Sequence, residues 1–189
     1  MNKAIFLDRD GTINVEKKYL YKIEDFEFLP GVIEGLKILQ QKDYLLIILT
    51  NQSGIGRGYY TEEDFVKLND WMLQELNREG VLITKVYYCP HLPTAKMTRY
   101  RKICTCRKPA LGMYGQAIKE FDIDISLSYA IGDKIRDCSI CEKMGCRGFI
   151  IAENENSKVI EAVKGGKCRN IRYETDLLAC AKRIAQMEG

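Results

Sequence analysis

The chain has 189 residues, which suits one globular domain with a modest insertion. Hydrophobic residues make up 46% and charged residues 29%, close to the average for globular proteins, and this excludes a disordered or low-complexity chain. The net charge of +3 is too small to predict a nucleic-acid or membrane-surface binder by charge alone. No run of about 18 apolar residues is present and the first ten residues lack a cleavage site, so we expect a cytoplasmic protein without membrane contacts.

Short apolar runs alternate with amphipathic stretches along the chain, which is typical of an α/β protein with a doubly wound, mostly parallel sheet. We expect strands at residues 4–7, 44–49, 85–88, 128–131 and 148–151. Helical spacing of apolar residues predicts helices at about 30–40, 61–76, 111–121, 135–142 and 177–184. Thr61 and Asp64 resemble a capping box at the start of the second of these helices. The chain is predicted to be a single domain, 1–189, with one elaborated loop at about 89–109.

Three of the expected strands end in polar residues: Asp8 with Asp10, Thr50 with Asn51, and Asp133. In an open parallel sheet these ends meet at one edge, where ligands bind. Two carboxylates about 4 Å apart repel each other by roughly 4 kcal/mol at an effective dielectric of 20. A magnesium ion shared with a substrate phosphate would relieve this repulsion. We therefore expect Asp8, Asp10 and Asp133 to bind Mg²⁺.

His91 is the only histidine and belongs to a cysteine–histidine motif, so the nucleophile must be a carboxylate, a thiol or a hydroxyl. A carboxylate can attack phosphorus and form an aspartyl-phosphate, and we assign this role to Asp8. Asp10 is then placed to protonate the leaving oxygen and later to activate water.

Other polar residues near the strand ends could bind the phosphoryl group. The hydroxyl of Thr50 and the backbone amides of Asn51 and Gln52 could hold phosphate oxygens, and Lys108 would offset negative charge on the transferring group. Gly54, Gly56 and Gly58 resemble a nucleotide-binding fingerprint but lack its ribose-binding acid, so we interpret residues 54–58 as a flexible loop beside the phosphate.

Cys89-x-His91 and Cys104-x-Cys106 are separated by 12 residues within the aperiodic stretch 89–109. One histidine and three thiolates make a closed tetrahedral set for zinc. Because the four ligands leave no open coordination position and the insertion has few apolar residues, we predict a structural zinc.

Basic residues gather beside this motif: Lys96, Arg99, Arg101, Lys102, Arg107 and Lys108. Residues 96–102 are interpreted as a solvated face. Arg107 abuts a predicted zinc ligand, which would hold it rigidly where it could grip a distal phosphate or sugar oxygen. A zinc-stabilised nucleic-acid-binding module that uses residues 96–102 is the alternative from another class.

The remaining cysteines allow two interpretations. Cys138 and Cys141 form a C-x-x-C pair that could be redox-active, yet they fall on an expected helix, where cysteine is often simply buried. We favour core packing for both, and for Cys146, Cys168 and Cys180.

The motifs taken together resemble the haloacid dehalogenase superfamily of aspartate-nucleophile phosphatases. Residues 6–12, 49–58, 106–109 and 131–134 with Asp137 are similar to its four motifs. Residues 88–91, the 12-residue gap and residues 104–109 resemble the D-glycero-D-manno-heptose 1,7-bisphosphate 7-phosphatase family in particular. The similarity runs from about residue 3 to about residue 150.

This resemblance implies Mg²⁺-dependent removal of the 7-phosphate during synthesis of nucleotide-activated heptose for lipopolysaccharide core or surface glycans. It also implies that Asp8 is the nucleophile, Asp10 the general acid/base, and that Thr50 and Lys108 stabilise the phosphoryl group while Arg107 recognises the substrate. The substrate-lining residues it implies are Glu16, Lys17, Lys18, Tyr19, Thr50, Asn51, Gln52, Ser53, Arg107 and Lys108. A large cap domain is not expected, because residues 13–43 hold little beyond one helix.

A histidinol-phosphate phosphatase is the nearest alternative, since it resembles the chain through the same motifs and a related zinc loop. The long gap between His91 and Cys104 and the pair Arg107-Lys108 favour the sugar phosphate. We expect a monomer whose partner is a small phosphorylated sugar, with Mg²⁺ and Zn²⁺ as cofactors.

Overall fold

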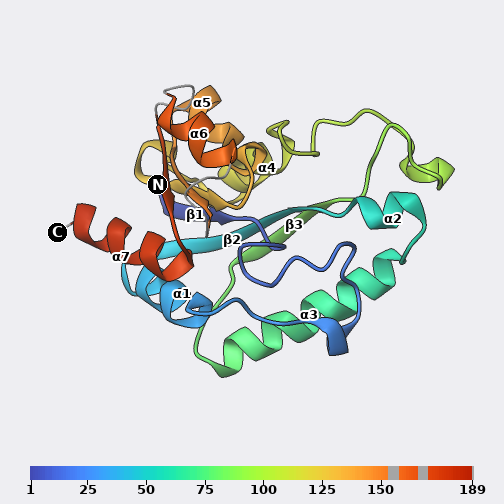
Figure 1. Cartoon of the computed structure of the whole chain (residues 1–189), viewed down its shortest axis with the longest axis horizontal. Coiled ribbons are helices and arrows are strands. Elements are labelled where there is room, and N and C mark those ends of the chain that lie inside the picture. Colours follow the sequence, from blue (N-terminus) through green and yellow to red (C-terminus); the bar gives the residue numbers. More distant parts are fainter. Residues whose placement is uncertain (153–157, 166–169, 189) are drawn as a thin grey trace.

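The computed structural model describes residues 1–152, 158–165 and 170–188, and within them six parallel strands form one sheet in the order β3-β2-β1-β4-β5-β6 (Figure 1). The strands are β1 (Lys3–Leu7), β2 (Tyr44–Asn51), β3 (Lys85–Cys89), β4 (Tyr129–Gly132), β5 (Arg147–Ile151) and β6 (Ile171–Glu174). The α-helices are α1 (Val32–Gln41), α2 (Ser53–Arg57), α3 (Glu62–Arg78), α4 (Gly112–Phe121), α5 (Ser139–Met144), α6 (Lys158–Lys164) and α7 (Leu177–Met187). Short 3₁₀ turns are η1 (Ile23–Asp25), η2 (Thr98–Tyr100), η3 (Ile125–Leu127) and η4 (Ile135–Cys138).

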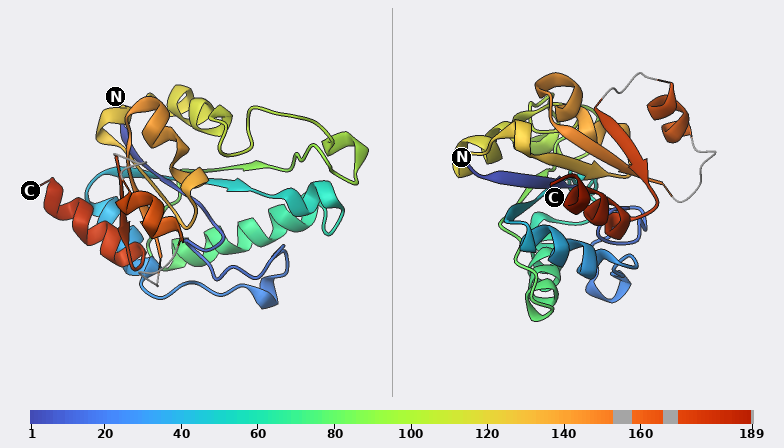
Figure 2. Two further views of the ribbon diagram at one scale, coloured as in Figure 1. Left: turned by 45° about the horizontal axis from the view of Figure 1, so that its top comes forward. Right: turned by 90° about the vertical axis from the view of Figure 1, so that its left-hand side faces the viewer.

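Helices cover both faces of the sheet, as the turned views show (Figure 2). Side chains of β1 point alternately to the two sides, so Ile5 and Leu7 join one core and Ala4 and Phe6 join the other. The first core packs against α1, α3 and α7, and the second against α4, α5 and α6. The predicted doubly wound parallel sheet is confirmed.

Several local predictions are confirmed and several are wrong. Asp64 N donates a hydrogen bond to Thr61 Oγ1 (3.1 Å) and Thr61 N donates one to Asp64 Oδ2 (2.8 Å), which forms the capping box of α3. The helix expected at about 30–40 begins only at Val32, after Gly31 with φ of 76°, and ends at Gln41. The sequence analysis did not predict strand β6.

Residues 54–58 were predicted to be a flexible loop, but most of this segment belongs to helix α2. A Cβ atom at Gly54 would lie 2.1 Å from the ring of Tyr60, and one at Gly56 would lie 2.6 Å from the carbonyl oxygen of Pro90. These glycines therefore allow the helix to pack closely against its neighbours. They do not make the segment flexible.

The carboxyl ends of the central strands carry no large cap among the described residues. Between β1 and α1 the chain forms only η1 and connecting segments. A long loop after β3 extends beside α2 at one end of the molecule, where Met97 N donates to Gly56 O over 2.9 Å (Figure 1). No helix in the described part of the chain is long and apolar enough to cross a bilayer.

Candidate active site and metal centre

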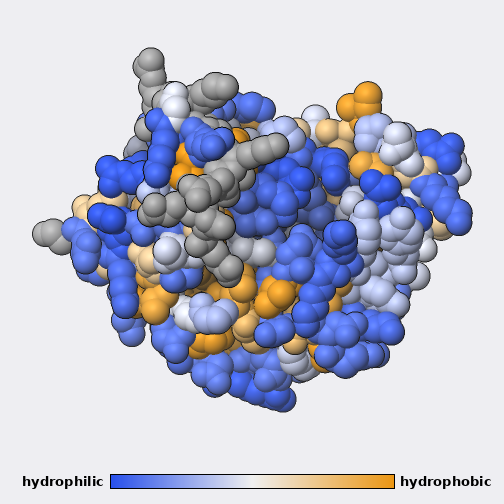
Figure 3. All heavy atoms as spheres, viewed as in Figure 1, coloured by the Kyte–Doolittle hydropathy of each residue, from blue (hydrophilic) through white to orange (hydrophobic). Residues whose placement is uncertain are grey.

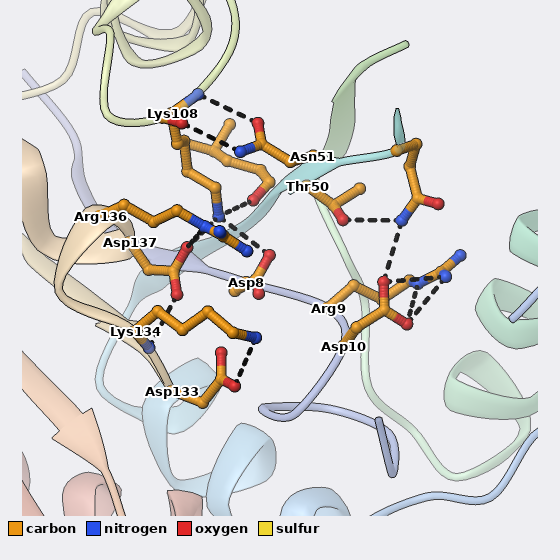
Figure 4. A network of polar contacts seen from close by, with 12 residues as sticks. Asp8, Arg9, Asp10, Thr50, Asn51, Lys108, Asp133, Lys134, Arg136 and Asp137 are labelled. Atoms are coloured by element: carbon orange, nitrogen blue, oxygen red, sulfur yellow. Dashed lines mark hydrogen bonds and ion pairs between the residues drawn. The ribbon is translucent and has the colours of Figure 1, made fainter. Parts of the chain in front are cut away.

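Asp8 lies immediately after β1 and is only 6% exposed. Its backbone amide donates to Ile131 O of β4 over 3.0 Å, which anchors the residue between the two central strands. The ammonium group of Lys108 lies 2.9 Å from Asp8 Oδ1 and 2.8 Å from Asp137 Oδ1, and donates to Leu49 O over 2.6 Å (Figure 4). One buried cation therefore joins two buried carboxylates from different strand ends.

Burial is the main reason that the pKa of Asp8 is raised to about 6, and the Asp137 and Asp10 charges raise it further while Lys108 lowers it. Burial disfavours the charged form of Lys108, but the two carboxylates outweigh this effect and raise its pKa. The site thus keeps a protonated lysine beside a carboxylate that ionises near neutral pH.

Carboxylate oxygens of Asp8, Asp133 and Asp137 lie within 4.8 Å of one another and could hold a metal ion. Asp133 Oδ2 accepts from Lys134 Nζ over 2.8 Å, whereas Asp133 Oδ1 is buried without a hydrogen-bond partner among the described residues. Burial also raises the pKa of Asp133. An unpaired oxygen in a crowded group of acids fits a hard divalent cation.

Gly11 makes room for this group. Its φ is +83°, and a Cβ atom there would lie 2.6 Å from Asp133 Oδ2. A side chain at this position would therefore strain the backbone and displace Asp133.

The carboxylate of Asp10 lies outside the acidic group, although the sequence analysis assigned it to Mg²⁺ together with Asp8 and Asp133. Gln52 Nε2 donates to its Oδ2 over 3.0 Å, and Asn14 Nδ2 donates to its Oδ1 over 3.1 Å. The Arg9 guanidinium contacts both oxygens at 2.9–3.0 Å. These donors hold the Asp10 carboxylate away from Asp133, and Asp137 takes the third place in the acidic group.

Gln52 links Asp10 to the end of β2. Its Nε2 atom also donates to Thr50 Oγ1 over 2.8 Å, and its Oε1 atom accepts from the Tyr60 hydroxyl over 2.5 Å. The Asn51 side chain forms a two-way bridge to Lys108, accepting from Lys108 N and donating to Lys108 O, each over 3.0 Å. The end of β2 therefore orients both Asp10 and the segment that carries Lys108.

A pocket of about 390 Å³ opens beside these residues. It is lined by Asp10, Glu16, Lys18, Tyr19, Leu20, Asn51, Gln52, Ser53, Gly54, Tyr60, Arg107, Lys134 and Arg136. Hydrophilic side chains dominate the surface between the body of the molecule and the projecting loop (Figure 3).

The structure brings most of the predicted substrate residues to this pocket: Glu16, Lys18, Tyr19, Asn51, Gln52, Ser53 and Arg107. Three predicted substrate residues, Lys17, Thr50 and Lys108, are not among the lining residues, and the Lys17 ammonium lies 3.3 Å from Glu27 Oε2. Lys18 and Tyr19 adopt φ of 44° and 62°, which non-glycine residues rarely do, so this turn is locally strained beside the pocket.

Sequence reasoning assigned no function to Arg9, Tyr60, Lys134 or Arg136. Arg9 is 1% exposed. Its place in the sequence between Asp8 and Asp10 could have indicated that it belongs to the site. Lys134 and Arg136 follow Asp133 directly, so their place at the same sheet edge was predictable from that strand end. Tyr60 lies beyond α2, a helix that the sequence analysis missed.

The structure also brings Cys89, His91, Cys104 and Cys106 together, with all four ligand atoms within 4.8 Å of one another. Cys106 Sγ lies 2.9 Å from Cys89 Sγ, 3.3 Å from Cys104 Sγ and 3.2 Å from His91 Nδ1. Metal–sulfur bonds of about 2.3 Å in a tetrahedral site place two sulfur ligands roughly 3.8 Å apart. The distances from Cys89 Sγ to Cys104 Sγ (3.6 Å) and to His91 Nδ1 (3.7 Å) are close to this spacing. The group could therefore hold a metal ion.

This cysteine–histidine group is tied to the pocket. Arg107, next to Cys106, donates from Nη1 to His91 O over 3.4 Å. Glu62 at the start of α3 accepts hydrogen bonds from Tyr88 (2.6 Å) and Tyr100, which flank the group. The loop is thus fixed to the body on both sides, and it delivers Arg107 and Lys108 to the site.

The other cysteines pack as predicted where the structure describes them. Cys138, Cys141 and Cys146 have 0% exposure in the core beneath α4 and α5, and Cys180 is equally buried in the core beside α1. Cys168 lies outside the described residues.

The sequence of this chain is similar to those of known phosphatases. A family model described as polynucleotide kinase 3 phosphatase matches residues 3–137. The chain is 44% identical over 163 residues to D-glycero-beta-D-manno-heptose-1,7-bisphosphate 7-phosphatase of Haemophilus ducreyi, covering 86% of this chain and 89% of that protein. It is 52% identical over 156 residues to the alpha-anomer 7-phosphatase of Campylobacter jejuni, covering 82% and 85%.

A solved structure agrees with these relatives. The crystal structure of D,D-heptose 1,7-bisphosphate phosphatase from B. bronchiseptica, complexed with magnesium and phosphate, superposes with a TM-score of 0.81. Identity to it is 29%, and the match covers 98% of this chain and 99% of that one. The predicted resemblance is confirmed, and a histidinol-phosphate phosphatase is not favoured. The chain belongs to the D-glycero-D-manno-heptose 1,7-bisphosphate 7-phosphatase family of the haloacid dehalogenase superfamily.

Proposed function

We propose that this chain hydrolyses the 7-phosphate of D-glycero-D-manno-heptose 1,7-bisphosphate through an aspartyl-phosphate at Asp8. The observation that carries the proposal is the buried Asp8 carboxylate at the end of β1, with Lys108 at 2.9 Å and Asp133 and Asp137 beside it. The substrate class comes from the relatives, which are heptose bisphosphate phosphatases at 44% and 52% identity.

In the first step a carboxylate oxygen of Asp8 attacks the phosphorus of the 7-phosphate. The bond between phosphorus and O7 of the sugar breaks, and Asp10 gives its proton to O7. Thr50 and Lys108 offset the negative charge on the phosphoryl oxygens as the group transfers.

In the second step Asp10, now ionised, takes a proton from water. The water oxygen attacks phosphorus, the bond to Asp8 breaks, and inorganic phosphate leaves. The hydrogen bonds from Gln52 and Asn14 keep the Asp10 carboxylate oriented through both proton transfers.

The acidic group fits magnesium. We assign Asp8, Asp10 and Asp133 as its ligands. The Asp10 carboxylate lies outside the acidic group, so Asp10 would bind through its backbone carbonyl oxygen while its carboxylate transfers protons, and Asp137 adds a further carboxylate beside the ion. The ion would supply positive charge that offsets the crowded carboxylates and the substrate phosphate. Lys108 supplies part of this charge from the protein itself.

The cysteine–histidine group fits zinc, which prefers a tetrahedral set of thiolate and imidazole ligands. We assign Cys89, His91, Cys104 and Cys106 to a structural Zn²⁺. Because four protein ligands complete the tetrahedron, the ion would stabilise the loop at 89–109 and would not contact substrate.

The pocket supports recognition of one sugar. We assign Glu16, Lys18, Tyr19 and Ser53 to the heptose, and Arg107 to an oxygen of the substrate distant from the cleaved phosphate. Lys17 is left out because its side chain turns to Glu27.

The test is phosphate release, with Mg²⁺ supplied, from the two anomers of heptose 1,7-bisphosphate and from histidinol phosphate. We expect kcat/KM on at least one heptose anomer to exceed that on histidinol phosphate by at least about 100-fold. Faster turnover of histidinol phosphate, or no turnover of either heptose, would contradict the proposal.

A further inference from the structure

Two arginines from separate segments line the 390 Å³ pocket. Arg107 comes from the loop at 89–109, and Arg136 belongs to η4. Two cations that face one pocket repel each other in the free protein, and an anionic ligand would relieve that repulsion.

Arg136 lines the same pocket as Arg107 but comes from the segment after β4, whereas the loop that carries Arg107 follows β3. Its Nε atom is buried and has no hydrogen-bond partner in the described part of the chain. The nearest carboxylate oxygen, Asp137 Oδ1, lies 3.9 Å away and is already paired with Lys108 at 2.8 Å. The Arg136 guanidinium can therefore donate hydrogen bonds to a ligand.

Lys134, two residues earlier, provides a contrast. Its ammonium lies 2.8 Å from Asp133 Oδ2 and 3.6 Å from Glu16 Oε2, so internal partners neutralise it. Among the described residues Arg136 has no carboxylate partner this close, although it lines the same pocket (Figure 4).

Side-chain exposure distinguishes the buried part of the site, beside Asp8, from its outer part. The Lys108 side chain beside Asp8 is 1% exposed, whereas the Arg136 side chain is 41% exposed and Arg107 is partly buried. Arg107 and Arg136 thus belong to the outer, pocket-lining part of the site, and Lys108 belongs to its buried part beside Asp8. A substrate with one phosphate against Asp8 would place its second phosphate toward this outer part.

We propose that Arg136 forms the second half of a two-arginine clamp with Arg107, and that this clamp holds the phosphate that is not cleaved. The inference rests on the proposed function, since it requires a bisphosphate substrate. Planar guanidinium groups can each donate two parallel hydrogen bonds to a phosphate, so two of them from different segments would fix its position and its orientation. Arg136 would then determine the preference for a bisphosphate over a monophosphate.

The test compares two substrates that differ only in the distal phosphate, heptose 1,7-bisphosphate and heptose 7-phosphate. In Arg136→Gln we expect the ratio of kcat/KM for the bisphosphate to that for the monophosphate to fall about 10- to 100-fold, mainly through KM. Arg136→Lys keeps the charge but loses the fork, and should recover part of the ratio. Arg78→Gln is the matched control, because Arg78 is 70% exposed on α3 and contacts Glu75.

A double-mutant cycle with Arg107→Gln makes the test sharper. If both arginines hold one phosphate, their effects on the ratio should not be additive. An unchanged ratio in Arg136→Gln, or equal losses on both substrates, would overturn the clamp. A wild-type protein that hydrolyses neither sugar would instead contradict the proposed function, so the two failures are distinguishable.

Discussion

Lys108 Nζ lies 2.9 Å from Asp8 Oδ1, although the two residues are 100 positions apart in the chain. Both side chains are almost fully buried, and Asp137 Oδ1 lies 2.8 Å from the same ammonium. This contact joins the end of β1 to the loop that follows the cysteine–histidine group. It makes Lys108 both a structural ion-pair partner and a candidate for stabilising the transferred phosphoryl group.

Replacing Lys108 with methionine should therefore affect stability and turnover together. Lys108→Met leaves two buried carboxylates without their shared cation, and we expect the free energy of unfolding to fall by about 3–5 kcal/mol. We expect kcat to fall by about 10²- to 10³-fold. Urea denaturation and phosphate release measure the two effects. The control is Lys37→Met, which removes an exposed pair to Glu79 at 3.7 Å and should cost at most about 1 kcal/mol. Equal stability losses in the two variants would contradict the account.

Gly11→Ala tests the close approach to Asp133. The new methyl group would lie 2.6 Å from Asp133 Oδ2, so we expect the Mg²⁺ concentration for half-maximal activity to rise by at least about 10-fold. Gly80→Ala is the matched control, because Gly80 has φ of +80° but nothing within 4 Å of the added atom. That variant should lose about 1 kcal/mol of stability from backbone strain and keep its Mg²⁺ response. A normal Mg²⁺ response in Gly11→Ala would argue against Asp133 as a ligand.

The raised pKa of Asp8 predicts a pH dependence of stability in Mg²⁺-free buffer without chelator. The pKa is about 6 in the folded protein and 3.8 in its reference state, so the folded protein binds more protons between these values. Protonated Asp8 therefore contributes to the free energy of unfolding. This contribution is fully present below about pH 4 and is lost as the pH rises toward 6. The Asp8→Asn variant cannot ionise there. We expect the free energy of unfolding of Asp8→Asn minus that of wild type to rise across pH 4–6 and then to level off. If the two proteins instead give parallel curves of unfolding free energy against pH, the pKa of Asp8 is normal and the account is contradicted.

The zinc assignment predicts the behaviour of a ligand variant. Cys104→Ser should lower bound zinc from about one ion per chain to much less than one, measured by elemental analysis, and should lower the unfolding temperature. Because Cys106 is adjacent to Arg107 and Lys108, turnover should also fall. Cys180→Ser, buried beside α1 and outside the group, should lose stability but retain zinc. Full zinc content in Cys104→Ser would contradict the assignment.

The sequence predicted the parts of the fold that depend on long apolar runs and strand ends. Asp8, Thr50 and Asp133 were placed at one sheet edge because parallel strands end together there. Strand β6 was missed because it has only four residues, and two of them, Arg172 and Glu174, are charged, so it lacks the continuous apolar run by which the other strands were recognised. Helix α2 was missed because Gly54 and Gly56 suggest flexibility, while their actual role is close packing against Tyr60 and Pro90.

The sequence predicted which residues belong to the site better than it predicted the hydrogen bonds and ion pairs that they make. The metal-ligand group around His91 could be predicted from the cysteine spacing, since the loop at 89–109 has few apolar residues that could form a core in its place. The direction of the Asp10 carboxylate was not predictable, because it depends on Gln52 from another strand and on Asn14 across a turn. The lack of a close partner for Arg136 likewise emerged only once Lys108 was seen to occupy Asp137.

The central claim is that phosphorus becomes bonded to Asp8 during turnover. The most direct measurement is acid quenching of the protein within a single turnover of substrate labelled with ³²P at the 7-phosphate, followed by peptide mapping. We expect label on the peptide that carries Asp8, released by hydroxylamine and absent from Asp8→Asn. Label found only in free phosphate, together with native turnover by Asp8→Asn, would contradict the account.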